Sequence, residues 1–583
     1  MASADLMPAA PERLWLLGSL GAALLLALPS AGNGLWADDW SHLAAARELP
    51  SAGVAPLGLF RFPQQPADVE RLTGAGLYPW WTDRGLKLSF FRPLSSLLAT
   101  LDYRFFGAAA AVPHLESIAW YLLLLGALAA LLRRALPGSW GPALFLVSID
   151  PSHAVTVGWL ANRNALVASA LAAWGLVAHL RWREERWRPG RALSLLGLAL
   201  GLAGGEVALG VLGYLLAYEL FAAPGSRVAR ARALLPALLL LAGYLVHYRW
   251  GGYGASGSGL YLDPSRSPLR FLAAAPERAL ALLGAATLAL PADAWALGPG
   301  SRVALAGGGA LALAIGGPWL RNLWPGLERR GLGWLLPGAA LSLVPCLATF
   351  PASRMLLVPT LGLDAAIACA LLAALRQRTE RRWRVLAPAL VLALGHLAGP
   401  LVAWPVSSIA LRSWSLELDR VATSAEIDAA PLPAQRLVLL VAPDPVLAFH
   451  LPALRALRGL PLPAHYSVLS MARADHRIAR TGPATLELEL RHGEMMTTPF
   501  EALVRDADHP LRAGERLEAG GLRATVLEVG TRGPRRVCFD FDAPLDGAAL
   551  QWLEWREGGL RRWRPPAIGE SVEWRWEPGV MPL

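Results

Sequence analysis

The chain has 583 residues, of which 54% are hydrophobic and 17% are charged, and its mean hydropathy is +0.39. Charged residues make up about a quarter of a typical soluble domain, so this composition excludes an ordinary soluble protein. The net charge of +10 comes almost entirely from arginine, because Lys87 is the only lysine, and the arginines cluster in short loops between apolar runs. This distribution favours membrane topology over nucleic-acid binding.

Apolar runs recur from the N-terminus to about Trp404 and then stop. Because about 20 apolar residues cross the hydrocarbon core, residues 1–412 are predicted to form a polytopic α-helical membrane domain with about eleven spans. The expected spans are Leu14–Leu28, Ile118–Leu132, Trp140–Ile149, Ala165–Leu180, Ala192–Ala203, Val207–Phe221, Ala233–His247, Val303–Leu320, Leu332–Phe350, Met355–Leu375 and Val385–Trp404.

Short basic loops stay on the cytoplasmic side of a membrane, and this rule fixes the expected orientation. Four loops qualify: Arg181–Arg191, Gly225–Arg232, Arg321–Arg330 and Arg376–Arg384. All four loops lie on the same side only if an even number of spans separates each loop from the next. This requires Leu269–Leu290 to be an interfacial or re-entrant helix rather than a span, and the segment from Phe90 onward is expected to be interfacial as well. The loop at 30–113 and everything after Trp404 then face away from the cytoplasm.

Residues 413–583 differ in character from the rest of the chain. The sequence "RLVLLVAPDP" indicates a buried strand, "TLELELR" alternates with period two, and "GLRATVLEVGTRGPRRVCFDFD" indicates two strands around a turn. A C-terminal soluble domain, β-rich or α+β and non-cytoplasmic, is therefore predicted. The three cysteines match neither a metal-binding spacing nor a disulfide framework.

Two adjacent carboxylates, Asp38 and Asp39, follow the first apolar run in "WADDW", with His42 close behind. One of them can act as a general base that takes the proton from an attacking hydroxyl. The alternative is a solvated turn or a helix cap, because "WSHLAAARE" reads as a short helix.

Further charged or polar residues are expected on the same side of the membrane. Arginines there can hold a phosphate, since the guanidinium fork matches its oxygens, although a lone arginine at a helix end more often snorkels to the interface. Glu206 lies among apolar residues and requires a partner. The candidates for donor-phosphate binding are Arg92, Arg163 and Arg354, and the candidates for other substrate contacts are His42, His153, Asn164 and Glu206.

The acid pair within an arginine-rich, multi-span domain resembles the GT-C superfamily of membrane glycosyltransferases. "FFRPLSSLLATLDYRFFG", "DPSHAVTVGWLANRNALVASALAAW", "GLAGGEVAL" and "SRMLLVPTLGL" follow the order and spacing of the transmembrane and TPR-containing O-mannosyltransferase branch. The departures from that branch are Asp150 for a histidine, Thr156 near a glutamate position, Asn164 for an acid, Gly205 for a lysine and Ser353 for a glutamate. The TPR part is absent.

The resemblance implies an inverting hexosyltransferase of the multi-pass bacterial inner membrane. It would move a sugar from a polyprenyl-phosphate donor to a hydroxyl of a lipid, glycan or protein on the periplasmic side. Asp38 or Asp39 would be the base, and the arginines would stabilise the departing lipid phosphate. No dedicated metal site is apparent, although the acid pair can hold a divalent cation partly through waters.

Two other classes of function remain open. A transporter or flippase would use Glu206 and the arginines as a central site and would show matching halves with broken helices. A non-catalytic membrane scaffold would bind a partner through its outer domain, and mutation of the acid pair would then affect only stability.

Overall fold

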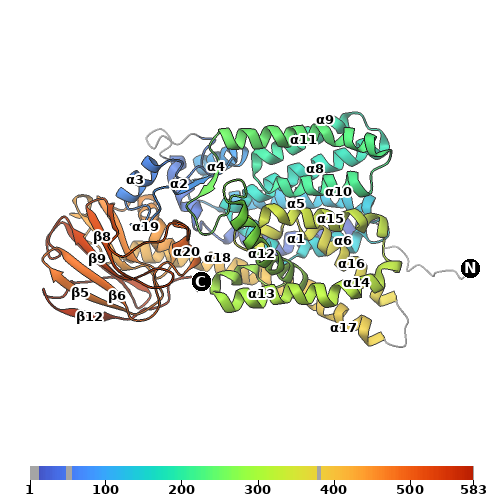
Figure 1. Cartoon of the computed structure of the whole chain (residues 1–583). Helices are drawn as coiled ribbons and strands as arrows, with labels where there is room; N and C mark the ends of the chain where they lie inside the picture. The colour runs from blue at the N-terminus through green and yellow to red at the C-terminus, as the bar shows by residue number, and fades with distance from the viewer. Residues whose placement is uncertain (1–11, 48–55, 377–381, 582–583) are drawn as a thin grey trace, which may run out of the picture. The chain divides into compact units, whose positions relative to one another are not determined.

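The computed structural model describes residues 12–47, 56–376 and 382–581. The chain forms two compact units (Figure 1). The first, the helical unit, comprises Met1–Gly34, Phe90–Gly251 and Leu269–Arg412. The second, the β-rich unit, comprises Leu35–Ser89, Gly252–Pro268 and Ser413–Leu583, and it holds every strand of the described residues.

The helical unit is built from α-helices joined by short 3-10 and π-helical turns. Its main helices are α1 (Glu12–Ala27), α4 (Pro93–Phe106), α5 (Ala111–Ala135), α6 (Trp140–Ile149), α7 (His153–Gly158), α8 (Arg163–Glu185), α9 (Pro189–Gly204), α10 (Ala208–Phe221), α11 (Arg227–Trp250), α12 (Pro268–Leu288), α13 (Pro299–Leu311), α14 (Gly317–Leu323), α15 (Arg329–Cys346), α16 (Thr360–Arg376), α17 (Arg382–Ala393) and α18 (Gly399–Ser424).

Within the described part of the chain, seven helical segments are long and apolar enough to cross a bilayer. Many of their apolar side chains are exposed; Val303 is 73% exposed and Leu401 is 66% exposed. Exposed apolar surface of this extent is expected of helices that face lipid rather than water. The prediction of a polytopic helical membrane protein with a β-rich tail is confirmed, whereas the count of about eleven spans stays a prediction.

Two segments differ from the expected boundaries. α12 covers the segment predicted to be interfacial, yet its 21 residues are among the seven candidate spans. α18 continues to Ser424, well past Trp404, because Leu411, Leu418 and Val421 recur at helical spacing and are buried. Most of the basic loop Arg376–Arg384 lies outside the described residues, and so does part of the loop at 30–113.

Close packing of α8 against α9 depends on glycines. A Cβ atom on Gly197 would lie 2.7 Å from the Cα atom of Gly175, and one on Gly201 would lie 2.9 Å from the carbonyl oxygen of Ala168. Small residues at such contacts let helix backbones approach closely, which is the usual source of helix association inside a membrane.

The β-rich unit contains two larger sheets. One has the order β11-β10-β3-β4 and the other has the order β12-β5-β6-β9-β8-β7. In β6 the burial alternates, with Leu486, Leu488 and Leu490 buried, as the period-two pattern predicts. The strands are β3 (Arg436–Val441), β4 (His465–Ser470), β5 (His476–Gly482), β6 (Thr485–Leu490), β7 (Arg516–Ala519), β8 (Leu522–Val529), β9 (Pro534–Phe541), β10 (Leu550–Arg556), β11 (Gly559–Arg562) and β12 (Ser571–Trp574).

Residues 35–89 and 252–268 belong to the same compact unit as the C-terminal residues 413–583. Strand β1 (Lys87–Ser89) pairs antiparallel with β2 (Gly254–Ser256), and helix α2 (Asp38–Arg47) packs on α19 (Pro445–Leu457). Helix α3 (Pro66–Gly74) and the short α20 (Pro499–Ala502) complete the unit.

The contact of this early segment with the tail is tightest at Gly76. This residue has a φ of +75°, and a Cβ atom there would lie 1.7 Å from the carbonyl oxygen of Tyr466. Only glycine fits without strain in both respects.

We therefore predict that Gly76→Ala lowers the free energy of unfolding of the β-rich unit by at least about 2 kcal/mol. Thermal unfolding of the full chain, followed by limited proteolysis of the tail, measures this change. Gly74→Ala is the matched control, because a Cβ atom at Gly74 meets nothing within 4 Å. Equal stability of the two variants would contradict the assignment of residues 35–89 to this unit.

Candidate functional site

The acid pair begins helix α2, and its two members have different surroundings. Asp39 is fully buried, and its Oδ2 accepts a hydrogen bond from the backbone N–H of Trp36 at 3.0 Å. Trp36 in turn packs against Trp414, with ring centroids 5.9 Å apart. Asp39 thus ties the first turn of α2 back to Trp36, the residue that lies two positions before the helix.

Asp38 is the accessible member of the pair, with 44% of its side chain exposed. The side chain of His450 on α19 lies beside it, with Nε2 4.0 Å from Oδ1 of Asp38. Nδ1 of His450 is 2.9 Å from the hydroxyl of Ser41. Burial lowers the pKa of His450, although the Asp38 charge opposes this shift. Apart from this histidine, Asp38 forms no ion pair within the described residues.

The phenol of Tyr78 is close enough to Asp38 to be affected by its charge. Burial raises the pKa of Tyr78 well above its usual range, and the negative charge of Asp38 raises it further. Its phenol therefore stays protonated at neutral pH. The predicted candidate His42 is buried against the rings of Phe60 and Phe62, at centroid distances of 4.7 and 6.0 Å.

In the helical unit, Arg92 and Glu206 come together. Nε of Arg92 donates to Oε2 of Glu206 at 2.7 Å, and the hydroxyl of Tyr248 donates to Oε1 of the same carboxylate at 3.2 Å. Both charged side chains are about a fifth exposed, at 20% and 23%. This pair supplies the partner that the sequence demanded for Glu206.

Arg163 is held by several acceptors at the start of α8. It forms an ion pair with Asp102 on α4, donates to the carbonyl oxygen of Pro113 at 3.1 Å and lies 3.3 Å from Glu116. Its side chain is only 5% exposed. These contacts describe a structural cation that fixes α4 and α5 to α8.

Arg354 has a different environment, in the 3-10 turn Ser353–Leu356. Its guanidinium carbon lies 5.5 Å from the ring centroid of Trp159 and 5.2 Å from that of Phe350. Within the described ranges it forms no ion pair with a carboxylate. Aromatic faces hold a cation without neutralising it, so Arg354 retains both its charge and its N–H donors.

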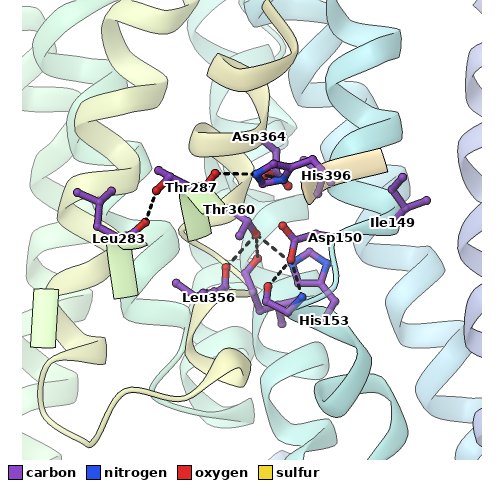
Figure 2. Close-up of polar contacts among 12 residues, drawn as sticks. Ile149, Asp150, His153, Leu283, Thr287, Leu356, Thr360, Asp364 and His396 are labelled. Carbon is purple, nitrogen blue, oxygen red and sulfur yellow. Dashed lines mark hydrogen bonds and ion pairs between the residues drawn. The ribbon is translucent and has the colours of Figure 1, made fainter. Parts of the chain in front are cut away.

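The remaining candidates are hydrogen-bonded inside the helical unit. Nδ1 of His153 lies 3.0 Å from the hydroxyl of Tyr121. Nε2 of His153 lies 2.9 Å from the hydroxyl of Thr360 (Figure 2). Asn164 donates to the carbonyl oxygen of Ala161 at 2.7 Å. Both side chains are buried, and neither faces open solvent.

Two groups of residues have the spacing of metal ligands, and although the sequence pointed to Asp150, it did not show either grouping. Asp150, Asp364 and His396 lie fully buried in the helical unit (Figure 2). Asp364 and His396 each stand alone in an apolar run, which was the available signal. In the other unit, Asp83, Asp506 and His509 gather at the surface, where His509 already pairs with both carboxylates at 2.9 and 3.3 Å.

One cleft in the helical unit lies away from these residues. It has a volume of about 310 Å³ and lies between α8 and α9, lined mainly by apolar side chains together with Arg181. Its apolar lining suits lipid or neighbouring side chains better than a phosphate or a sugar. The candidate catalytic and binding residues are therefore judged by their own contacts and not by their position in this cleft.

Comparison with known proteins gives no matching family model and no matching curated protein. Two solved structures that the chain is similar to are crystal structures of ArnT from Cupriavidus metallidurans, one bound to undecaprenyl phosphate and one in the apo state. Each is 14% identical to the chain, and each alignment covers 91% of this chain and 98% of the other, with TM-scores of 0.39 and 0.40. A likeness of this degree fixes neither the fold nor the activity of the chain.

The contacts of Arg163 lead to a test of its structural role. We predict that Asp102→Asn destabilises the helical unit by about 3 kcal/mol, because it leaves a buried guanidinium charge with one partner fewer. The thermal midpoint of the detergent-solubilised chain measures the loss. Glu116→Gln is the control, since the Glu116 side chain is 39% exposed and should cost little. A larger loss for Glu116→Gln would contradict the role given to Asp102.

Proposed function

We propose that the chain is an inverting GT-C-type membrane glycosyltransferase. It takes a sugar from a polyprenyl-phosphate donor and transfers it to an acceptor hydroxyl on the non-cytoplasmic face of the membrane. The proposal rests on the residues of this chain, and the acid and the arginines are assigned separately because they belong to different units.

The observation that carries the proposal is the uncompensated charge of Arg354. An arginine in a membrane unit is costly unless an anion accompanies it, and Arg163 and Arg92 both have carboxylate partners. Arg354 has aromatic rings instead. The guanidinium fork matches phosphate oxygens and stays charged near lipid, so a lipid phosphate is the anion that fits.

Asp38 is the general base of the proposed reaction. Its side chain is 44% exposed, and within the described residues it forms no ion pair with an arginine or lysine. Asp39 is the positioning residue, since its carboxylate is buried and bonded to the backbone of Trp36. A base of this kind contributes about 10²- to 10⁴-fold to a rate.

The step follows from these two roles. The acceptor oxygen forms a bond to the anomeric carbon, the bond from that carbon to the phosphate oxygen breaks, and the proton of the acceptor hydroxyl passes to Asp38. The electron pair of the broken bond stays on the polyprenyl phosphate, where an arginine stabilises the charge. Attack from the side opposite the leaving group inverts the anomeric configuration.

We predict that Asp38→Asn lowers sugar transfer about 100-fold or more, because the amide cannot take the acceptor proton. Membranes that contain the chain are incubated with a panel of labelled polyprenyl-phosphate sugars and native acceptors, at matched expression. Asp39→Asn should lose less in the chemical step and more in stability, because it weakens the anchor of α2.

The control is Asp68→Asn, which removes another acid from the same segment, at the start of α3. Its transfer should equal that of the wild type. Equal transfer by the wild type and both acid-pair variants would overturn the role of the pair. Transfer with retained anomeric configuration would overturn direct displacement.

A further inference from the structure

A buried cluster at the centre of the helical unit lies outside the proposed transfer chemistry. Asp150 ends α6, Asp364 lies in α16, and His396 lies in the π-helical turn Leu394–Ala398 between α17 and α18. Figure 2 shows their side chains gathered together, and one donor atom of each lies within 4.8 Å of the others. Their exposed fractions are 3%, 0% and 2%.

The carboxylate of Asp364 lacks the donors that a buried acid requires. Neither of its buried oxygens accepts a hydrogen bond from an N–H or alcohol group of the described chain, and the polar group that faces it most directly is another acid, Asp150. Asp150, in contrast, has hydrogen-bond donors. Its Oδ1 accepts from the backbone N–H of Ser152 at 2.7 Å and from the side-chain hydroxyl of Ser152. No lysine or arginine within the described residues pairs with either acid. An orphaned buried carboxylate is costly unless a positive charge faces it.

The histidine presents a lone pair to the same place. Nε2 of His396 lies 3.1 Å from the carbonyl oxygen of Thr287 on α12. A carbonyl oxygen can only accept, so Nε2 carries a proton and donates, and in the neutral ring Nδ1 is unprotonated. This is the arrangement in which a carbonyl orients a metal-binding histidine from behind.

The distance between His396 and Asp364 distinguishes a direct hydrogen bond between the two side chains from shared binding of one metal ion. Nδ1 and Oδ1 are 3.7 Å apart, too far for a direct hydrogen bond. The separation is close to that of two donors that share one ion with bonds of about 2.0–2.2 Å. Three electron-rich atoms therefore surround a position that requires a cation.

We propose that Asp150, Asp364 and His396 bind one divalent first-row transition-metal ion, such as Zn²⁺ or Mn²⁺. Two carboxylates and a neutral imidazole with a divalent ion give a site of zero net charge, which suits an apolar interior. The imidazole nitrogen disfavours Mg²⁺ and Ca²⁺, which take oxygen ligands. The ion joins α6, α16 and the turn before α18, and it stabilises the helical unit.

The test is the metal content of the full-length chain, purified in detergent from cells supplied with Zn²⁺ and Mn²⁺ and measured by mass spectrometry. We expect about one ion per wild-type chain. Asp364→Asn and His396→Gln should each weaken metal binding by about tenfold or more. The control is His179→Gln, because His179 is also a buried histidine of this unit but is bonded to Glu219 at 2.7 Å.

A second measurement on the wild type alone covers the case in which a variant fails to fold. A strong chelator should lower the thermal midpoint of the helical unit, and Zn²⁺ or Mn²⁺ should restore it. A wild-type chain that carries no ion, and whose midpoint moves with neither chelator nor metal, would overturn the proposal and leave a proton shared by the two acids. Unchanged metal content in both ligand variants would also overturn it.

Discussion

Charge neutralisation inside an apolar unit is the constraint on which the rest of the structure depends. A charge without a partner is costly in a membrane, so most buried ions of the helical unit occur in pairs. Arg163 joins Asp102, Arg92 joins Glu206, and Glu219 joins both His179 and Arg183. Each pair also links helices that lie far apart in the sequence. These pairs fix the positions of α4, α8 and α10 while keeping the interior neutral.

Some charges depart from this rule, and buried Arg278 donates to the carbonyl oxygen of Leu347 at 2.8 Å rather than to a carboxylate. Two other departures, of opposite sign, bear on the proposals. Arg354 is a cation held by the rings of Trp159 and Phe350 without an anion, and Asp364 is an acid without a donor, beside Asp150 and His396. The same argument gives each its ligand class. An uncompensated guanidinium suits a phosphate, and two acids with an imidazole lone pair suit a metal ion. The proposed donor site and the proposed metal site are therefore consequences of one electrostatic requirement.

Much of the fold could be predicted because its signals are local. The apolar run Trp140–Ile149 coincides with α6, and the alternation of "TLELEL" gives β6 with its buried face. The pairing of β1 with β2 could not be predicted, since both strands are three residues long and lie far apart in the sequence. The candidate site could be predicted from the sequence even less well than the fold. A sequence shows that Glu206 requires a partner but does not show that the partner is Arg92, and a lone Asp364 gives no hint that His396 faces it.

The measurement that tests the account most directly is the affinity of the purified full-length chain for polyprenyl phosphate. We compare the wild type with Arg354→Gln and with Arg384→Gln, an exposed arginine that stacks on Trp383 at 5.3 Å. The account predicts saturable binding by the wild type, a loss of roughly tenfold or more for Arg354→Gln and no change for Arg384→Gln. Equal affinity of all three proteins, or no binding by the wild type, would contradict it.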